Sequence, residues 1–173
     1  MKNQIYKILI ALTFGFSAFT GNTQSIFTGT WEYQSGNEIF RVFLWEDNLE
    51  SGSQVIKGHY EKVIVNGDGT ETFVYCSDKE KFLGQNKAWL PFVIHGADNN
   101  QELSGTFTDN TVDQSVYAQQ KSGQIRIEVI SNSGGVNPII TASWKVKRGQ
   151  GPIINESPNF SVPVDIVLTK VNN

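Results

Sequence analysis

The sequence predicts an all-β fold, an antiparallel barrel or closed β-sandwich of about 8–10 short strands with at most one short helix. Apolar and polar residues alternate with a period of two along most of the chain. Turn-forming residues at 35–37 (Ser-Gly-Asn) and 67–69 (Gly-Asp-Gly) separate the alternating runs. Cys76 is the single cysteine, so a hydrophobic core and not an internal disulfide must hold the fold together. We expect Cys76 to be a buried, inert thiol.

Residues 1–24 have the composition of a secretory signal peptide. Lys2 and Lys7 precede an apolar run at 8–19, and small polar residues follow at 20–24. The apolar run is shorter than the about 20 residues that a membrane span requires, so cleavage is favoured over a retained anchor. We therefore expect a secreted or periplasmic bacterial protein with no stable membrane anchor after cleavage. The sequence leaves open the exact cleavage site and the choice between periplasm and exterior.

Residues 25–173 are predicted to form a single barrel-like domain, since a chain of this length suffices for one hydrophobic core. Loss of Lys2 and Lys7 leaves 12 Lys and Arg residues against 17 Asp and Glu residues, a net charge of −5. An acidic chain does not favour nucleic acid or an anionic membrane surface as a partner. The oligomeric state is not indicated by any feature of the sequence.

The expected strands share alternation and a β-branched or aromatic composition. They are residues 28–34, 38–46, 54–66, 70–76, 89–95, 102–108, 114–119, 124–131, 139–147 and 164–171. Turns are expected at 97–100 and 121–123, and an extended, proline-containing crossing at 149–163. Residues 78–86 are predicted to form a short helix or an ordered loop. The order of the strands in the sheet is not indicated.

The late strands are apolar on one face and polar on the other, which is typical of antiparallel strands that are half buried. The side chains expected to face water in 124–131 and 139–147 are Gln124, Arg126, Glu128, Ser143, Lys145 and Lys147. The segment 38–46 differs, because Phe43 and Trp45 give it a second apolar face opposite Val42 and Leu44. Such a strand is either covered by another segment or presents an aromatic surface.

The two-faced segment is the strongest functional indication in the sequence. A barrel of about eight strands can enclose one small ligand, and such pockets are mostly apolar. The candidate ligand-binding residues are Phe43, Trp45 and Tyr60. Other aromatic residues that would extend the same wall are Tyr75, Trp89 and Tyr117. The alternative interpretation is that Phe43 and Trp45 pack beneath a loop as part of the core.

No catalytic or metal-binding constellation is found in the sequence, so we predict no enzymatic activity, no cofactor and no metal. His59 and His95 have no partners in a Cys/His signature. Residues 66–71 carry closely spaced oxygen ligands but lack the acidic series of a calcium loop, which favours a plain hairpin turn. The acidic residues that a glycoside-hydrolase pair would use are Glu102, Asp109 and Asp113. Acidic residues near turns are usually only solvated.

Residues 28–32 (Thr-Gly-Thr-Trp-Glu) resemble the opening of lipocalin-like (calycin) barrels. The resemblance implies that Trp31 lies in the core and that a basic residue of a late strand packs over it. Lys145, Lys147 and Arg148 are the candidates for that basic residue. The usual second motif of that family, Thr-Asp with an aromatic residue, is absent.

A longer resemblance involves residues 29–33, 36–45, 143–148 and 158–169. These segments are similar to an uncharacterised family of small secreted proteins from Bacteroidetes-type bacteria. That resemblance implies secretion and a β-rich fold and carries no mechanism.

Three hypotheses about function follow, of which a hydrolase is the least favoured because it would require two carboxylates, or His95 and an acid, to converge in a cleft. The leading one is non-enzymatic binding of a small apolar or amphipathic ligand whose identity the sequence does not indicate; it requires a cavity. The alternative is a surface or protein-interaction module with an exposed aromatic patch, and it requires Phe43 and Trp45 to be exposed.

Overall fold

The computed structural model describes residues 24–78, 92–111, 121–148 and 160–171. Within these residues the regular secondary structure is entirely β, as the sequence predicts. The strands are β1 (Gly29–Ser35), β2 (Glu38–Asn48), β3 (Gln54–Val65), β4 (Glu71–Cys76), β5 (Ile94–Asp98), β6 (Glu102–Asp109), β7 (Lys121–Asn132), β8 (Ile140–Arg148) and β9 (Asp165–Val171). None of the described residues belongs to a helix long and apolar enough to cross a membrane.

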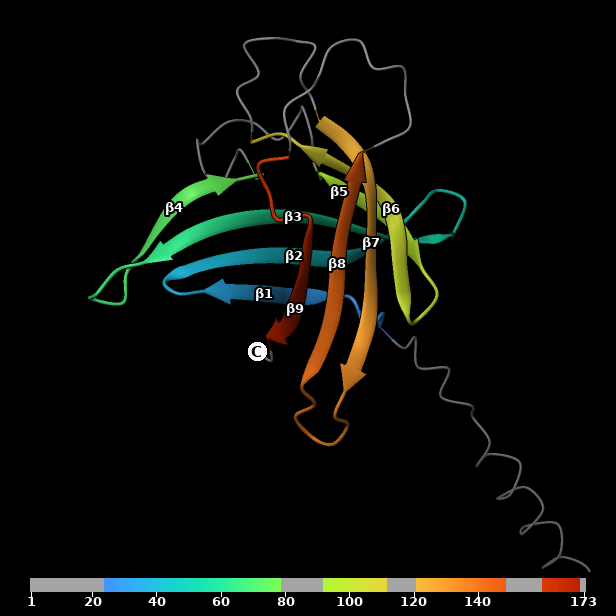
Figure 1. Cartoon of the computed structure of the whole chain (residues 1–173). Helices are drawn as coiled ribbons and strands as arrows, with labels where there is room; N and C mark the ends of the chain where they lie inside the picture. The colour runs from blue at the N-terminus through green and yellow to red at the C-terminus, as the bar shows by residue number, and fades with distance from the viewer. Residues whose placement is uncertain (1–23, 79–91, 112–120, 149–159, 172–173) are drawn as a thin grey trace, which may run out of the picture.

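The strands form a closed antiparallel barrel of eight strands with one extra strand. The strand order is β2-β1-β9-β8-β7-β6-β5-β3-β4, and pairing of β2 with β3 closes the ring (Figure 1). On its other edge β3 pairs with two strands in succession. Its residues 56–58 pair with β5, and its residues 61–65 pair with β4. The extra strand β4 therefore extends the sheet beyond the ring.

The fifth strand starts later than the sequence predicts and continues through the expected turn. Ile94–Asp98 forms β5, so Ala97 and Asp98 are paired with β6 and do not turn. The turn follows at Asn99, whose Oδ1 accepts hydrogen bonds from the backbone N–H groups of Gln101 and Glu102. The asparagine side chain thus stabilises the turn itself, as is common at such positions.

The turn predicted at 121–123 is wrong, because these residues begin β7. Ser122 pairs with Thr108, and Gly123 lies between Phe107 of β6 and Arg148 of β8. A Cβ at Gly123 would lie 2.3 Å from the carbonyl oxygen of Lys147. This glycine permits close approach of two strands and does not mark a turn. The predicted strand 114–119, the helix or loop after Asp78, most of the 149–163 crossing, and Trp89, Asp113 and Tyr117 lie outside the described residues.

Aromatic rings from several strands fill the core. Phe107 lies 5.3 Å from Tyr60 and 5.9 Å from Trp144, measured between ring centroids. Phe40 lies 5.5 Å from Trp144 and 6.0 Å from Tyr60. Edge-to-face and offset contacts of this kind each stabilise a core beyond the burial of their area. The same cluster also buries Trp31 completely.

Trp31 lies in the core as expected, but the basic residue that packs over its ring is not one of those expected. Its Nε1 donates a hydrogen bond to the carbonyl oxygen of Phe27 at 2.7 Å. Lys170 of β9 lies over its ring, with Nζ 5.7 Å from the centroid, and donates to the carbonyl oxygen of Ile26. Burial lowers the pKa of Lys170. Lys145, Lys147 and Arg148 were the wrong candidates, because β9 and not β8 pairs with β1.

Candidate functional site

The structure does not bring Phe43, Trp45 and Tyr60 together as one ligand-binding wall. Tyr60 is fully buried inside the barrel, where it pairs with Val42 of β2. Phe43 and Trp45 alternate with Val42 and Leu44 along β2, so they point to the outer face. The period of two places the residues on opposite sides of the sheet, and rings around Tyr60 occupy the space that a ligand would need.

The outer aromatic residues are partly covered. Phe43 and Trp45 are both of intermediate exposure. Trp45 packs on the ring of His59 at 5.5 Å between centroids, and His59 Nδ1 lies 3.2 Å from the hydroxyl oxygen of Ser77. The two side chains therefore form neither an internal wall nor a fully open aromatic patch.

Beside these aromatic residues, Arg41 joins four strands on the outer face. Its guanidinium contacts Glu32 of β1, Glu61 of β3 and Glu71 of β4, at 2.5, 3.4 and 2.5 Å respectively. The hydrogen bonds that Arg41 donates to the Glu71 carboxylate raise the pKa of Arg41, with Glu32 adding to the effect and burial opposing it. One cation therefore pairs with all three carboxylates, and we assign this cluster a structural role in joining the four strands.

Asp109, the most buried of the candidate acidic residues, is also a structural group. Its Oδ1 accepts hydrogen bonds from the Tyr60 hydroxyl at 2.9 Å and from the Thr111 backbone and hydroxyl. Its Oδ2 accepts from the backbone and hydroxyl of Ser161, both at 2.7 Å. Burial alone raises the pKa of the carboxyl, but the hydrogen bonds from Ser161 and Thr111 outweigh it and lower the pKa.

The remaining acidic and metal-ligand candidates do not converge. Glu102 is at the opposite end of β6 from Asp109, about 23 Å away at the usual rise of a strand. The hairpin at 66–70 is a plain turn, in which Asp68 accepts hydrogen bonds from the backbone and hydroxyl of Thr70. No group of three or more His, Cys, Asp or Glu side chains among the described residues is placed to hold a metal ion. Cys76 is buried, as expected.

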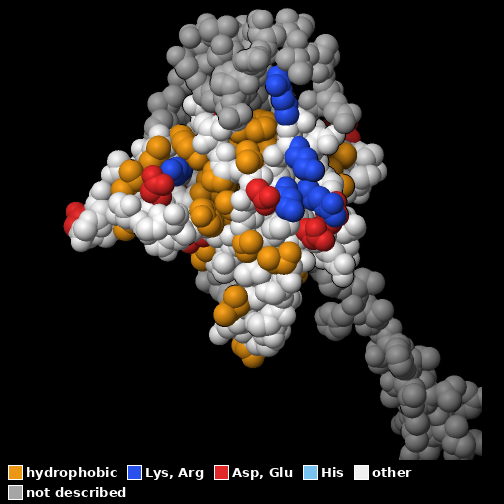
Figure 2. All heavy atoms as spheres, in the orientation of Figure 1, with side chains coloured by type: hydrophobic (Ala, Val, Ile, Leu, Met, Phe, Trp, Pro, Cys, Tyr) orange, Lys and Arg blue, Asp and Glu red, His pale blue; other side chains and the backbone are white. Residues whose placement is uncertain are grey.

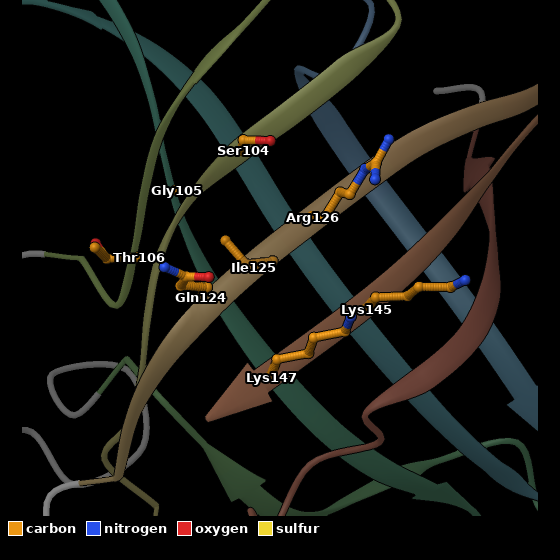
Figure 3. Close-up of a pocket in the computed structure, with 8 residues that line it drawn as sticks. All are labelled: Ser104, Gly105, Thr106, Gln124, Ile125, Arg126, Lys145 and Lys147. Atoms are coloured by element: carbon orange, nitrogen blue, oxygen red, sulfur yellow. The ribbon is translucent and has the colours of Figure 1, made fainter. Parts of the chain in front are cut away.

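A groove of about 560 Å³, lined mostly by polar residues, lies on the outer face of β6, β7 and β8 (Figure 3). The strand register arranges its side chains in two rows across the three strands. One row is Ser104, Arg126 and Lys145, and the other is Thr106, Gln124 and Lys147. Figure 3 shows the two lysine side chains extending in the same direction, one behind the other along β8.

The floor of the groove depends on glycine. Gly105 and Ile125 line it between the two rows, and the Ile125 side chain itself is buried in the core. Gly105 pairs with Gly96 of β5. A Cβ at Gly105 would lie 2.2 Å from the carbonyl oxygen of His95, so β5 and β6 approach more closely than any other residue would allow.

The groove carries an excess of positive charge at its β8 side. Arg126 is paired with Glu102 at 2.7 Å and with Glu128 at 3.5 Å. Lys145 and Lys147 are exposed and have no ion-pair partner within the described part of the chain. Figure 2 shows Lys and Arg side chains gathered on this face with acidic side chains beside them. The two lysines are therefore available to an anionic group.

The sequence predicts that Gln124, Arg126 and the two lysines face water, but it does not mark them as a site. The signal was present in the pair Lys145 and Lys147, two places apart on one face with no acidic residue between them. The rest of the groove comes from β6 and β7, and their register was needed to align the hydroxyls and the amide with the lysines.

A comparison with curated proteins found no match, and neither did one with solved structures. A comparison with protein families matched almost the whole sequence. Over residues 1–171 the chain belongs to a family of unknown function (DUF6705).

Proposed function

We propose that this chain is an exported, non-enzymatic binding protein whose groove on β6, β7 and β8 takes an anionic ligand. The observation that carries the proposal is the pair of exposed lysines, Lys145 and Lys147, which line a groove of about 560 Å³ and have no ion-pair partner among the described residues. The volume lies within the range of small-molecule sites in proteins.

The residues that line the groove are opposite in charge to the whole chain. The sequence has a net charge of −3, yet this face concentrates Arg126, Lys145 and Lys147. Long cationic side chains on an otherwise acidic surface attract anions locally while the remaining surface repels them. The lysine ammonium groups stay hydrated until a ligand arrives, so binding here is expected to be moderate and sensitive to salt.

The same structure gives less support to an apolar ligand inside the barrel. Tyr60 is enclosed by Phe40, Phe107 and Tyr75, with ring centroids 5.3 to 6.1 Å apart. An interior ligand would have to displace these rings, and removing such contacts from a core is costly. Asp109 has its oxygens occupied by internal donors, which supports a non-enzymatic function for this part of the barrel.

Amide NMR of the purified protein tests anion binding directly, with tricarballylate and tripolyphosphate as probes. We expect saturable shifts confined to residues 104–106, 124–126 and 145–147. Replacing both lysines (Lys145→Ala with Lys147→Ala) weakens binding about ten-fold. The matched control is Lys62→Ala, since Lys62 is a surface lysine of β3 that is paired with Glu38. Absence of saturable shifts, or equal loss in the control, contradicts the proposal.

Export is tested separately. The positive start and the apolar run of residues 1–24 support cleavage, which leaves a protein that is secreted or periplasmic and not anchored. Intact-mass measurement of the protein recovered from the periplasm and medium of an expressing bacterium should give a chain that begins near residue 25. Recovery only of full-length chain in the cytoplasm contradicts export without affecting the groove.

A further inference from the structure

We infer that the anionic ligand is an acidic saccharide, a sugar that carries carboxylates together with free hydroxyl groups. The inference rests on the proposed anion-binding function of the groove and specifies its chemistry. It comes from what lies beside the two lysines: the groove offers hydrogen-bond acceptors as well as cations, and a ligand that carries only negative charge would leave those acceptors unused.

The two hydroxyl groups in the groove have their hydrogens committed to neighbouring groups. Ser104 Oγ donates to the Glu102 carboxylate, and Thr106 Oγ1 donates to the carbonyl oxygen of His95 at 3.3 Å. Each hydroxyl oxygen retains an acceptor lone pair, and both residues are exposed. They are therefore suited to accept hydrogen bonds from a ligand that brings its own O–H groups.

Carboxylates border the cationic rows. Glu102 and Glu128 flank Arg126, and Asp165 of β9 lies directly opposite Lys145 in the register. These carboxylates repel a bare polyanion at close range, whereas they accept hydrogen bonds from sugar hydroxyls. Gln124, between Thr106 and Lys147, offers both an amide donor and an acceptor. The mixed border selects for a ligand that is anionic at some points and donating at others.

The lining also argues against two other ligand classes. No aromatic side chain of the described residues lines the groove, so they offer no ring on which a nucleobase or the apolar face of a neutral sugar could stack. Lys145 and Lys147 are two residues apart on one strand, roughly 7 Å at the usual rise. That separation suits a ligand with carboxylates on successive units of a short chain.

Isothermal titration of the purified protein with three trimers separates the contributions. Trigalacturonate supplies carboxylates and hydroxyls, tricarballylate supplies carboxylates alone, and maltotriose supplies hydroxyls alone. We expect trigalacturonate to bind about ten-fold more tightly than tricarballylate, and maltotriose not to bind. Replacing the two hydroxyls, Ser104→Ala with Thr106→Val, weakens trigalacturonate binding more than tricarballylate binding, so that most of the ten-fold preference is lost. The double lysine replacement weakens both anions together.

The outcomes are distinguishable. Equal, lysine-dependent affinities for trigalacturonate and tricarballylate overturn the saccharide inference and leave the proposed anion-binding function intact. Binding of maltotriose as tight as that of trigalacturonate also overturns it, because the lysines then play no part. If neither anion binds, the proposed function fails as well. If the preference for trigalacturonate over tricarballylate survives the loss of both hydroxyls, Ser104 and Thr106 do not bind the sugar hydroxyls. That result also overturns the inference.

Discussion

At the scale of single residues, the most consequential side chain of the interior is Asp109. It is fully buried. Its hydrogen-bond donors are neutral groups from three separate parts of the chain. Tyr60 belongs to β3, Thr111 follows β6, and Ser161 precedes β9. The carboxylate therefore ties three segments together at one point.

Asp109→Asn should destabilise the protein by about 2 kcal/mol, because an amide places its NH₂ group against a backbone or hydroxyl donor. Tyr60→Phe is the matched comparison, since it removes one of the same hydrogen bonds and leaves the carboxylate in place. We expect about 1 kcal/mol for that change. Urea unfolding followed by circular dichroism measures both. Equal stabilities of Asp109→Asn and wild type refute the role given to this carboxylate.

Asp109 also predicts how stability depends on pH. Its folded-state pKa is lowered, so its ionised form is favoured by folding. The stabilisation is complete above the unfolded pKa of about 3.9 and is lost as the pH falls through the folded pKa. Between about pH 5 and pH 3 the unfolding free energy of the wild type should decrease more steeply than that of Asp109→Asn. Parallel profiles for the two proteins contradict this assignment.

At the scale of elements, the closest strand approach in the site is between β5 and β6. Gly96 and Gly105 face one another there, and a Cβ on either would meet backbone atoms of the opposite strand at 2.5 Å or less. These backbone atoms cannot move aside to make room for a methyl group, as the end of a flexible side chain could. The pair thus brings β6 to the position from which Ser104 and Thr106 line the groove.

Gly105→Ala should destabilise the protein by about 3 kcal/mol, because the added methyl forces two paired strands apart. Gly67→Ala in the β3–β4 hairpin is the control, since a Cβ there meets nothing within 4 Å. That change should alter stability by less than about 0.5 kcal/mol. Thermal unfolding of both variants compares them, and a tolerated Gly105→Ala would show that the two strands have room to separate.

At the scale of the whole molecule, closure makes the barrel one packing unit. Pairing of β2 with β3 leaves eight strands joined edge to edge, and rings from β1, β2, β3, β6 and β8 meet in one core. A strand of such a ring has two partners, so its loss exposes two edges and part of the shared core. This arrangement favours unfolding in a single step.

We therefore expect two-state unfolding in urea. Tryptophan fluorescence includes the signals of Trp31 on β1 and Trp144 on β8, both fully buried, while far-ultraviolet circular dichroism reports the sheet as a whole. Their transitions should coincide in midpoint and slope. Separate midpoints would mean that part of the barrel opens independently of the rest.

Most of the strands were predictable, because their alternation is a local property. The errors have local causes as well. Gly123 and Ala97-Asp98 have turn-like composition, yet both are paired in strands because a neighbouring strand lies close enough to bond them. Composition does not reveal whether a glycine serves a turn or a close contact between strands.

The candidate site was less predictable than the fold. Alternation alone assigns Arg126, Lys145 and Lys147 to the water-facing side of their strands. That Phe43 and Tyr60 lie on opposite faces of the sheet follows only when the pairing register of β2 and β3 is known. The partnership of Lys170 with Trp31 required the order β8-β9-β1, which sets residues 139 positions apart side by side. Strand order is a non-local property that no single segment specifies.

The sequence by itself determined the all-β class, the approximate strands and the faces they bury, because each depends on the period of two within a short segment. Only the tertiary structure decided that the sheet closes through β2 and β3, that aromatic rings fill the interior around Tyr60, and that the hydroxyls of β6 lie beside the lysines of β8. These depend on which strands are neighbours and in which register, and pairing energies of that kind are shared across the whole barrel.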